Sequence, residues 1–343
     1  MKNIKVLGID LAKNVFQLHG TDAKGKCVLR KRLSRTKLIG FVANLQPCII
    51  GIEACGGSHY WARLFKQYGH EIRMMSPQFV KPFVKSNKSD RNDSEAIVEA
   101  CIRPSMRFVP IKTTDQQDIL IIHKARELAI KSRTAQANQI RGFLSEYGVI
   151  VPQGISKIKK LAEIIDVNQD MLTPLVIDLM TELYDLFKVY DAQVKKYDKQ
   201  LEILAKSNPL CQEVQKIPGV GPIIASAIVA TIGDAKAFKN GREVSAWLGL
   251  TPRQYSSGEK IVLGGISKRG DRYMRKLLVQ GARTAVKVCD NKKDKLSLWI
   301  ANKKQRCGYN KASVALANKN TRMIWAIMAT GECYRQPKEI LHG

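Results

Sequence analysis

The hydrophobic pattern of the first third of the chain alternates between strand and helix. Its apolar runs are short, rich in β-branched side chains and bounded by turn residues, which is typical of strands. The predicted strands cover residues 4–10, 14–19, 27–33, 48–53 and 71–75. Helices are predicted over 37–45 and 59–68. This order indicates an α/β fold, with a mixed sheet and helices packed against it.

The middle of the chain has the longer period of helices. One helix is predicted from Asp115 to about Tyr147, with Thr114 as its N-cap and Gln117 completing a capping box. A second starts at Thr173, with Pro174 at its first position. Its apolar residues alternate spacings of four and three, a heptad seam. They are Val176, Met180, Leu183, Phe187, Tyr190, Val194, Tyr197, Leu201 and Leu204.

This seam predicts an antiparallel helical hairpin, interpreted as a coiled coil. Two roles for it stay open. It joins subunits into a homo-oligomer, a dimer or tetramer, or it packs within one chain as a prop between domains.

The last third mixes helices with glycine-rich turns. KIPGVGP at 216–222, followed by the small-residue helix IIASAIVATIG, is the pattern of a helix-hairpin-helix motif. Gly219 and Gly221 would let backbone N–H groups approach a phosphate at the start of the second helix. The alternative is a plain tight turn between helices. Asn240 is predicted to cap a short helix over 241–248.

Residues 251–258 are predicted as a loop, Gly264 and Gly265 as a turn, and the segment after 270 as a basic helix. Arginine and lysine in this region suit phosphate contacts, although a solvated helix face is the ordinary alternative. The candidate nucleic-acid contacts are Lys216, Gly219, Gly221, Arg253, Lys268, Arg269, Arg272 and Arg275.

Charge supports a polyanionic partner. The 343 residues include 57 Lys and Arg against 30 Asp and Glu, a formal charge of +27. Basic and acidic groups number 19 and 8 in residues 1–110, 13 and 13 in 111–205, and 25 and 9 in 206–343. Three domains with these bounds are predicted: a catalytic α/β domain, a helical hairpin and a mainly helical C-terminal domain.

Nucleic acid is favoured over a membrane as that partner. The sequence has no apolar run long enough for a transmembrane helix, and its N-terminus lacks a signal-peptide pattern. The eight cysteines are scattered without metal-ligand spacing, which indicates reduced thiols of a cytoplasmic protein.

Four carboxylates carry the candidate chemistry. Asp90 and Asp93, in KSNKSDRNDSEAIVE, are three residues apart at a predicted helix start, and Asp10 and Glu53 end two predicted strands. If those strands pair and the helix crosses the same sheet, the four converge. Such a cluster suits Mg²⁺, or Mn²⁺, in phosphodiester cleavage. The alternative is an N-cap with a solvated first turn, and ordinary turn residues at the strand ends.

The motifs GIDLAK, GIEACGGSHYWA and KSDRNDSEAI together resemble those of the DEDD transposases of the one-ten family of insertion sequences, in particular the eleven-eleven subgroup. The resemblance implies an N-terminal domain like the RuvC resolvase, with a ribonuclease H-like fold. It makes Asp10, Glu53, Asp90 and Asp93 the metal-binding tetrad. It also implies a coiled coil used in assembly, and a bacterial, nucleoid-associated protein.

GLTPRQYSSGEK and GGISKRGDRYMRKLL resemble the C-terminal domain of the same family, in which a serine before a glycine is the nucleophile. The resemblance assigns that role to Ser257, with Ser256 as the ambiguity. From composition alone both are turn residues, and no histidine is near in sequence to act as their base. The resemblance further implies a bridge RNA that pairs with donor and target DNA.

We therefore expect a DNA transposase or recombinase that cuts and rejoins donor and target strands. Two alternatives stay open. One is a metal-dependent endonuclease like a Holliday-junction resolvase, in which the tetrad directs water and no serine takes part. The other is a non-catalytic nucleic-acid-binding scaffold.

Overall fold

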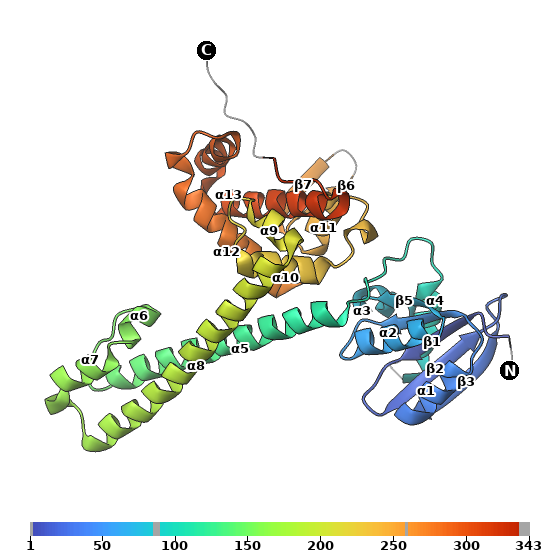
Figure 1. The fold of residues 1–343 in the computed structure, drawn as a ribbon, viewed down its shortest axis with the longest axis horizontal. Coiled ribbons are helices and arrows are strands. Elements are labelled where there is room, and N and C mark those ends of the chain that lie inside the picture. The colour runs from blue at the N-terminus through green and yellow to red at the C-terminus, as the bar shows by residue number, and fades with distance from the viewer. Residues whose placement is uncertain (1–2, 85–89, 258–259, 336–343) are drawn as a thin grey trace, which may run out of the picture. The chain divides into compact units, whose positions relative to one another are not determined.

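The computed structural model describes residues 3–84, 90–257 and 260–335, and it divides into two compact units, Met1–Thr113 and Thr114–Gly343 (Figure 1). The first unit is a sheet with helices. It contains β1 (Val6–Asp10), β2 (Val15–Thr21), β3 (Cys27–Ser34), α1 (Arg35–Ala43), β4 (Ile49–Glu53), α2 (Ser58–Gln67), β5 (Glu71–Met75), α3 (Pro77–Val80), η1 (Lys81–Phe83) and α4 (Asp90–Cys101).

The five strands form one mixed sheet in the order β3-β2-β1-β4-β5. The first three are antiparallel neighbours, whereas β4 runs parallel to both β1 and β5. All five predicted strands are present, and β5 has the predicted bounds. The mixed α/β sheet is confirmed, and it is consistent with the ribonuclease H-like fold that the resemblance implies.

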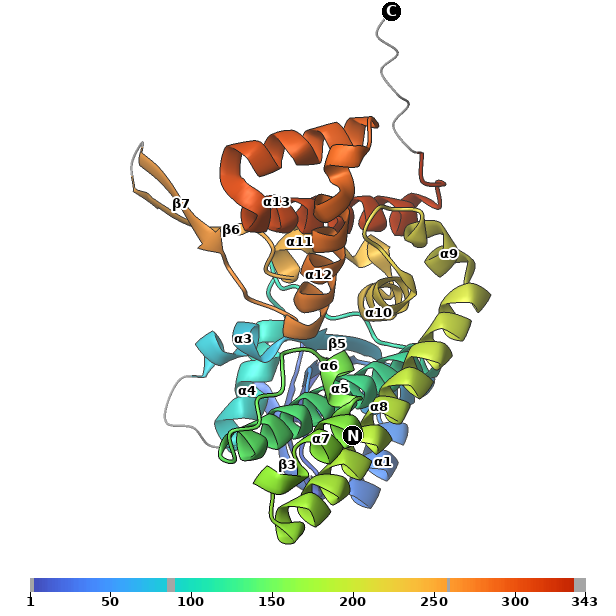
Figure 2. The same cartoon turned by 90° about the vertical axis from the view of Figure 1, so that its left-hand side faces the viewer.

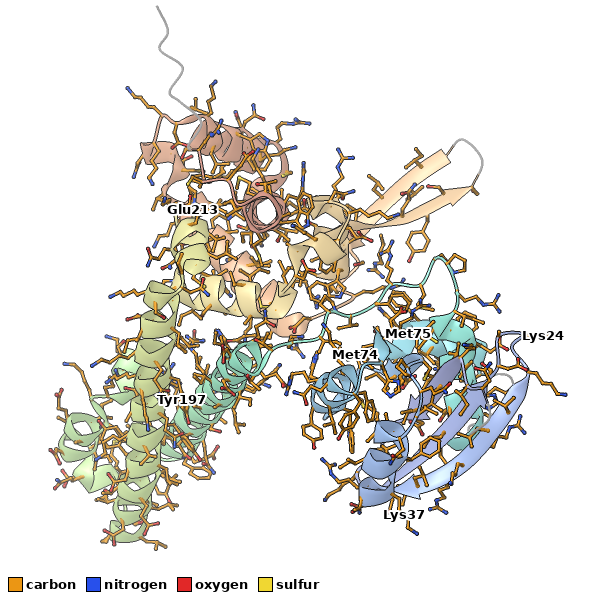
Figure 3. The ribbon with its side chains drawn as sticks, turned by 45° about the vertical axis from the view of Figure 1, so that its right-hand side comes forward. Lys24, Lys37, Met74, Met75, Tyr197 and Glu213 are labelled. Atoms are coloured by element: carbon orange, nitrogen blue, oxygen red, sulfur yellow. The ribbon has the colours of Figure 1, made fainter. Side chains whose placement is uncertain are left out.

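Successive residues of each strand face opposite sides of this sheet, so its two faces build separate cores. Met74 and Met75, neighbours on β5, show the division (Figure 3). Met74 packs in the cluster that contains Phe65 of α2 and residues of α1, while Met75 packs with Ile97 of α4. Helices α1 and α2 therefore cover one face and α4 covers the other.

The second unit is mainly helical. It contains α5 (Thr114–Ser145), α6 (Ile155–Ile158), α7 (Leu161–Val167), η2 (Gln169–Met171), α8 (Pro174–Ser207), α9 (Pro209–Gln215), α10 (Pro222–Ile232), η3 (Ala235–Ala237), α11 (Gly241–Trp247), β6 (Pro252–Ser257), β7 (Lys260–Ile266), α12 (Arg272–Val288), η4 (Cys289–Asn291) and α13 (Lys295–Thr330). No helix in the described part of the chain is long and apolar enough to cross a membrane.

The two long helices α5 and α8 lie antiparallel, because Arg126 pairs with Asp198 while Arg133, one heptad later, pairs with Asp191. Thr173 caps α8 and Pro174 opens it, as predicted. All nine positions of the heptad seam, including Tyr197 (Figure 3), are buried or half-buried. The seam thus packs within the chain. Helix α5 begins at Thr114 itself, one residue earlier than predicted.

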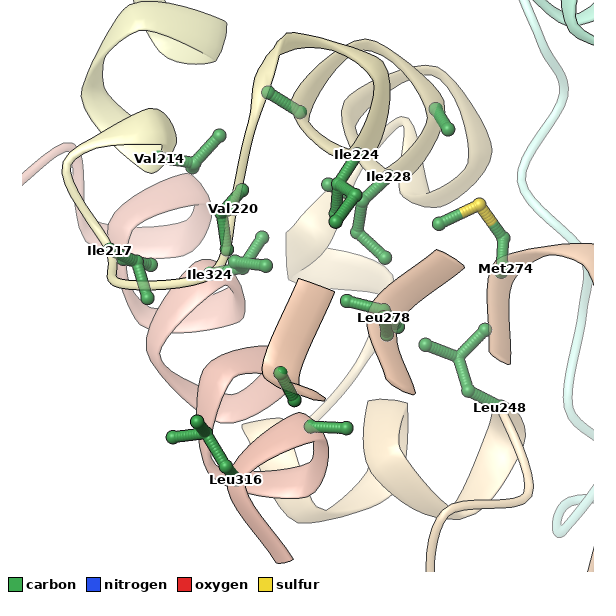
Figure 4. Packing of buried hydrophobic residues seen from close by; sticks show 14 of the residues in the cluster. Val214, Ile217, Val220, Ile224, Ile228, Leu248, Met274, Leu278, Leu316 and Ile324 are labelled. Atoms are coloured by element: carbon green, nitrogen blue, oxygen red, sulfur yellow. The ribbon is translucent and has the colours of Figure 1, made fainter. Parts of the chain in front are cut away.

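A second core joins the helices of the C-terminal part of this unit. Val220 of the turn before α10, Ile228 of α10, Leu278 of α12 and Leu316 and Ile324 of α13 pack together (Figure 4). Helix α13 thus closes this core. Helix α13 consists of two segments, because Gly308 has a φ of 80° that breaks the helix between them.

The predictions of a loop over residues 251–258 and of a turn at Gly264 and Gly265 are wrong where the structure describes these residues. Pro252–Ser257 and Lys260–Ile266 form the antiparallel strands β6 and β7, which extend away from the helices (Figure 2). The residues expected as a turn, Gly264 and Gly265, lie within β7. The run Ile261–Val262–Leu263 was the local signal for this strand, because β-branched and apolar residues favour it. Helices α6 and α7 were also missed.

One buried carboxylate holds the hairpin of α5 and α8 together. Asp191, on α8, accepts a hydrogen bond from Arg133 of α5 at 2.7 Å and pairs with Lys159 and Lys195 at 3.1 Å each. Burial raises the pKa of the Asp191 carboxyl, but hydrogen bonds from Lys195, Arg133 and Lys159 outweigh burial and lower the pKa to about 2. The resulting stabilisation is present above the unfolded pKa near 3.8 and is lost as pH falls towards 2.

The Asp191→Asn variant should lose about 2 kcal/mol of stability at neutral pH, since the pKa difference converts at about 1.4 kcal/mol per unit. Urea denaturation followed by the helical circular-dichroism signal measures the loss. Asp185→Asn is the matched control, because Asp185 lies on the same helix in an exposed pair with Lys188. That variant should change little. Equal effects of the two substitutions would contradict the assignment.

A buried histidine connects three helices of the second unit. His123 of α5 lies 2.9 Å from the Tyr273 hydroxyl of α12 and 3.1 Å from Ser226 Oγ of α10. Ser226 donates its proton to the carbonyl of Pro222, so its oxygen accepts from His123 Nε2, and Nδ1 accepts from Tyr273. The ring is therefore neutral. Burial first, then the charges of Arg126 and Lys124, lower its pKa to about 4.

His123 is neutral in the folded protein but takes up a proton in the unfolded chain at acid pH. Acid therefore favours unfolding. His123 should give the second unit full stability above pH 6.5 and progressively less as pH falls to about 4. We expect His123→Gln to flatten this part of the curve of melting temperature against pH. His59→Gln is the control, because His59 has a similarly low pKa, about 4, in the first unit. A wild-type slope in His123→Gln would refute the role.

Candidate active site

Asp10 and Glu53 end neighbouring parallel strands. The register of β1 and β4 pairs Gly8 with Gly51 and Ile9 with Ile52, so the two carboxylates follow side by side at the same edge of the sheet. Both residues are half-buried. Burial first, then the charges of Glu53 and Asp10, raises the pKa of the nearby Cys55 thiol. The two carboxylate-bearing strand ends are thus neighbours, and their role as a metal site stays a prediction.

Helix α4 packs on the face that carries these carboxylates, and glycine makes the contact. A Cβ at Gly8 would lie 2.4 Å from the Ser94 carbonyl oxygen and 2.7 Å from a Val98 methyl. A Cβ at Gly51 would lie 3.0 Å from Ile97. Because side chains alternate along a strand, Gly8 shares its face with Asp10, and Gly51 shares its face with Glu53. The glycines of GID and GIE therefore let α4 cross the sheet two residues before each carboxylate.

The other two carboxylates belong to the first turn of α4. Asp93, one residue before the contact at Ser94, is half-buried. Asp90 begins the helix, and its side chain lies outside the described residues. Among the residues that are described, no three acidic, histidine or cysteine side chains come close enough to hold a metal ion. The helix crosses at the level of the glycines, and Asp93 does not complete a group with Asp10 and Glu53. Convergence of all four stays a prediction.

A pocket of about 390 Å³ lies beyond the ends of β1 and β4 on the side of α2, and neither Asp10 nor Glu53 lines it. Leu11, next to Asp10, and Cys55, close to Glu53, form part of its wall. Its charged residues are Lys13 and Arg35, whose guanidinium lies 4.7 Å from the ring centroid of Trp61. Cations beside a carboxylate site suit a substrate phosphate. The sequence reasoning missed both residues, because neither has a local signal.

The candidate nucleophile lies in the second unit, at the end of β6. Ser257 is opposite Lys260, and Ser256 is opposite Ile261. Both serines are exposed. The Ser256 hydroxyl accepts a hydrogen bond of 2.8 Å from the side chain of Gln254. The two serines are thus strand residues at the tip of a hairpin, whereas composition had indicated a turn.

The turn between α9 and α10 needs glycine for packing. Gly219 has a φ of 86°, and a Cβ there would lie 2.6 Å from the carbonyl oxygen of Gly281 on α12. Gly221 faces open space. Lys216 is paired with Glu213 at 2.5 Å, and Glu213 (Figure 3) also accepts from the backbone of Tyr334. Packing against α12 therefore requires the glycine at position 219 of the predicted helix-hairpin-helix pattern. Phosphate binding by this turn stays a prediction.

The basic segment before α12 is held by its backbone. A Cβ at Gly249 would lie 2.0 Å from the Arg269 carbonyl oxygen, so the two segments touch directly. Arg275, predicted to bind phosphate, donates to the carbonyl oxygens of Leu248 and Arg269 at 2.9 and 3.3 Å. Lys268 has a φ of 56° and donates its backbone N–H to Gly249. Arg275 thus links the segment before α12 to the end of α11 by hydrogen bonds.

Two of the remaining candidate contacts, Arg253 on β6 and Arg272 at the start of α12, are exposed. Arg269, whose backbone meets Gly249, is exposed as well. The side chains of these three arginines are accessible to a nucleic-acid backbone.

Comparison with known proteins identifies the class of this protein as a DNA transposase, an enzyme that cuts and rejoins DNA. A family model described as Transposase, the DEDD transposase of IS110, matches residues 7–149. A second, described as the Transposase IS116/IS110/IS902 family, matches residues 211–297. The chain belongs to the IS110 family of transposases. The family favours an enzyme over the non-catalytic scaffold.

Relatives match nearly the whole chain. The transposase for insertion sequence element IS1111A of Coxiella burnetii is 46% identical over 98% of this chain and 92% of its own length. A probable family 20 transposase of Pseudomonas aeruginosa is 43% identical, over 97% and 99%. The transposase for insertion sequence element IS1328 of Yersinia enterocolitica is 40% identical, over 97% and 99%.

The two glycines of the α9–α10 turn should respond differently to alanine. Gly219→Ala should lower the melting temperature by several degrees, because it combines a positive φ with a backbone clash. Gly221→Ala should leave the melting temperature unchanged, and any effect there should appear only in DNA affinity. Thermal melts and equilibrium DNA binding of both variants test this. A melting temperature of Gly219→Ala equal to that of wild type would contradict the packing role.

Proposed function

We propose that this transposase cuts and rejoins donor and target DNA with the tetrad Asp10, Glu53, Asp90 and Asp93 and the nucleophile Ser257. The observation that carries the proposal is the placement of Asp10 and Glu53 on neighbouring strand ends, on the sheet face that α4 crosses. The DEDD family model covers these residues. A resolvase-like endonuclease would use the same carboxylates without the serine.

The carboxylates fit a hard divalent cation by their chemistry. Asp10 and Glu53 offer oxygen donors at a half-buried site, where burial first and then the charges of these two carboxylates raise the pKa of the Cys55 thiol. Mg²⁺ and Mn²⁺ take oxygen ligands, and such an ion, when bound, supplies charge neutralisation at the phosphate. The four carboxylates would hold it, while Lys13 and Arg35 of the adjoining pocket would orient the substrate phosphate.

Ser257 supports a covalent step because it is exposed at a hairpin tip. In this step Ser257 Oγ forms a bond to phosphorus while a strand oxygen leaves, and the serine proton passes to that oxygen. The energy of the phosphodiester is kept in the phosphoserine bond, so a strand hydroxyl can later attack it and rejoin the DNA. Exposed arginines on the same unit, Arg253 and Arg272, would contact the strand.

A bridge RNA that pairs with donor and target DNA completes the proposal, and it rests on the family resemblance alone. Assembly into a dimer or tetramer is proposed through the helical hairpin. Its seam residues pack within the chain, but Leu175, Leu179, Leu186 and Val189 form a separate exposed apolar stripe along α8. Such a stripe suits a second helix.

The serine and the tetrad are tested together with labelled donor DNA. Ser257→Ala should abolish the covalent protein–DNA adduct seen on denaturing gels and leave DNA binding intact. Ser256→Ala is the matched control and should retain the adduct. Asp10→Asn should lower the cleavage rate by about 100-fold or more, as loss of a charge-stabilising group does.

Each result separates the alternatives. An adduct of undiminished yield from Ser257→Ala would reject the nucleophile. Metal-dependent cleavage without any adduct would favour the resolvase-like endonuclease. Wild-type cleavage by Asp10→Asn would remove Asp10 from the site.

A further inference from the structure

The second unit contains a groove that is separate from Ser257 and from the predicted phosphate-binding turns. It has a volume of about 1150 Å³ and runs between α11, α13 and the base of the β6–β7 hairpin. Its lining includes five cationic side chains and no acidic residue. The cations are Arg242, Lys303, Lys311, Lys319 and Arg322.

These cations are uncompensated. Within the described ranges, none of the five lies within 4.0 Å of a carboxylate. Three other cations of the same unit, Lys216, Lys276 and Lys304, each form an ion pair. Five like charges around one hollow raise its potential, which an anionic ligand would relieve.

The groove also has an aromatic wall. Trp299 is half-buried, and the Lys319 ammonium lies 4.6 Å from its ring centroid. Trp325 is fixed in place, because its indole N–H donates to the Ala235 carbonyl at 3.0 Å. Cations that alternate with aromatic rings are the means by which proteins hold single strands, with phosphates on the cations and bases on the rings.

The wall is rigid where α11 meets α13. A Cβ at Gly241 would lie 2.8 Å from the Arg322 Cα, so the two backbones touch. Asn318 donates to the Leu250 carbonyl at 3.2 Å. The break at Gly308 separates the segment that carries Trp299 and Lys303 from the segment that carries the other α13 cations, and both segments line the groove.

We propose that this groove binds an unpaired segment of nucleic acid, with its phosphates on the five cations and a base against Trp299. DNA and RNA strands share this chemistry. The site does not depend on the carboxylates or on Ser257, so it stands or falls independently of the catalytic assignment.

The test is the affinity of the full chain for labelled oligothymidylate, oligouridylate and duplex DNA as a function of salt. The triple variant Arg242→Gln, Lys311→Gln, Arg322→Gln removes three exposed cations of the groove. Each lost phosphate contact should lower the salt slope by about 0.7, so the slope should fall by about 2 and the affinity roughly 100-fold at about 0.1 M salt.

The matched control is Lys196→Gln, Lys199→Gln, Lys206→Gln, which removes the same charge from the exposed face of α8. It should change the salt slope little. Trp299→Phe should weaken single-strand binding without changing the salt slope, because it alters base contact and not charge. Circular dichroism checks that every variant is folded.

If the groove variant loses affinity for oligothymidylate, the ligand is a DNA strand. If it loses affinity for oligouridylate alone, the ligand is RNA. Equal affinities of the groove variant and the control for both single strands would overturn the proposal. A loss of affinity confined to duplex DNA would also overturn the proposal, because the groove would then bind double-stranded and not unpaired nucleic acid.

Discussion

The candidate site depends on the close approach of α4 to Gly8 and Gly51 in the first unit. A side chain at either position would displace the helix, since Ser94, Val98 and Ile97 occupy the space that its Cβ would take. The same alternation that points these glycines at α4 points Asp10 and Glu53 at it two residues later. The position of the site therefore follows from this packing. On each strand the carboxylate is the next residue on the same face after the glycine that contacts α4.

The second unit uses direct backbone contact for the same purpose. Gly219 meets Gly281, Gly249 meets Arg269, and Gly270 meets the carbonyl of Trp247. These contacts fix the turn between α9 and α10 and the segments that connect α11 to β6 and β7 to α12. The segment around Lys268 and Arg269 is thereby held beside the end of α11, and Arg275 reinforces it through two carbonyl oxygens. Basic residues on such a loop can meet a phosphate without first losing much conformational entropy.

Local periodicity predicted most elements of both units. The strand pattern was sufficient for β5, and the cap at Thr173 with Pro174 located the start of α8. The strands β6 and β7 were missed because the pair Gly264–Gly265 suggested a turn. In addition, residues 252–257 and 261–265 are all exposed, so no alternation of buried and exposed positions marks the strands. The adjacency of Asp10 and Glu53 was predictable because parallel strands end at one edge. The approach of Asp93 depends on how α4 packs, which no local pattern encodes.

Net charge was the most informative global property of the sequence, yet it does not show which cations are available. Lys216 and Lys276 are paired with carboxylates, and Arg275 is bound to backbone carbonyls. These residues contribute to +27 but are engaged within the protein. The cations of the groove between α11 and α13 are separated by up to eighty residues in the sequence and become neighbours only in the folded unit. In the basic C-terminal part of the chain, the tertiary structure therefore determines which cations stabilise the fold and which remain available to a ligand.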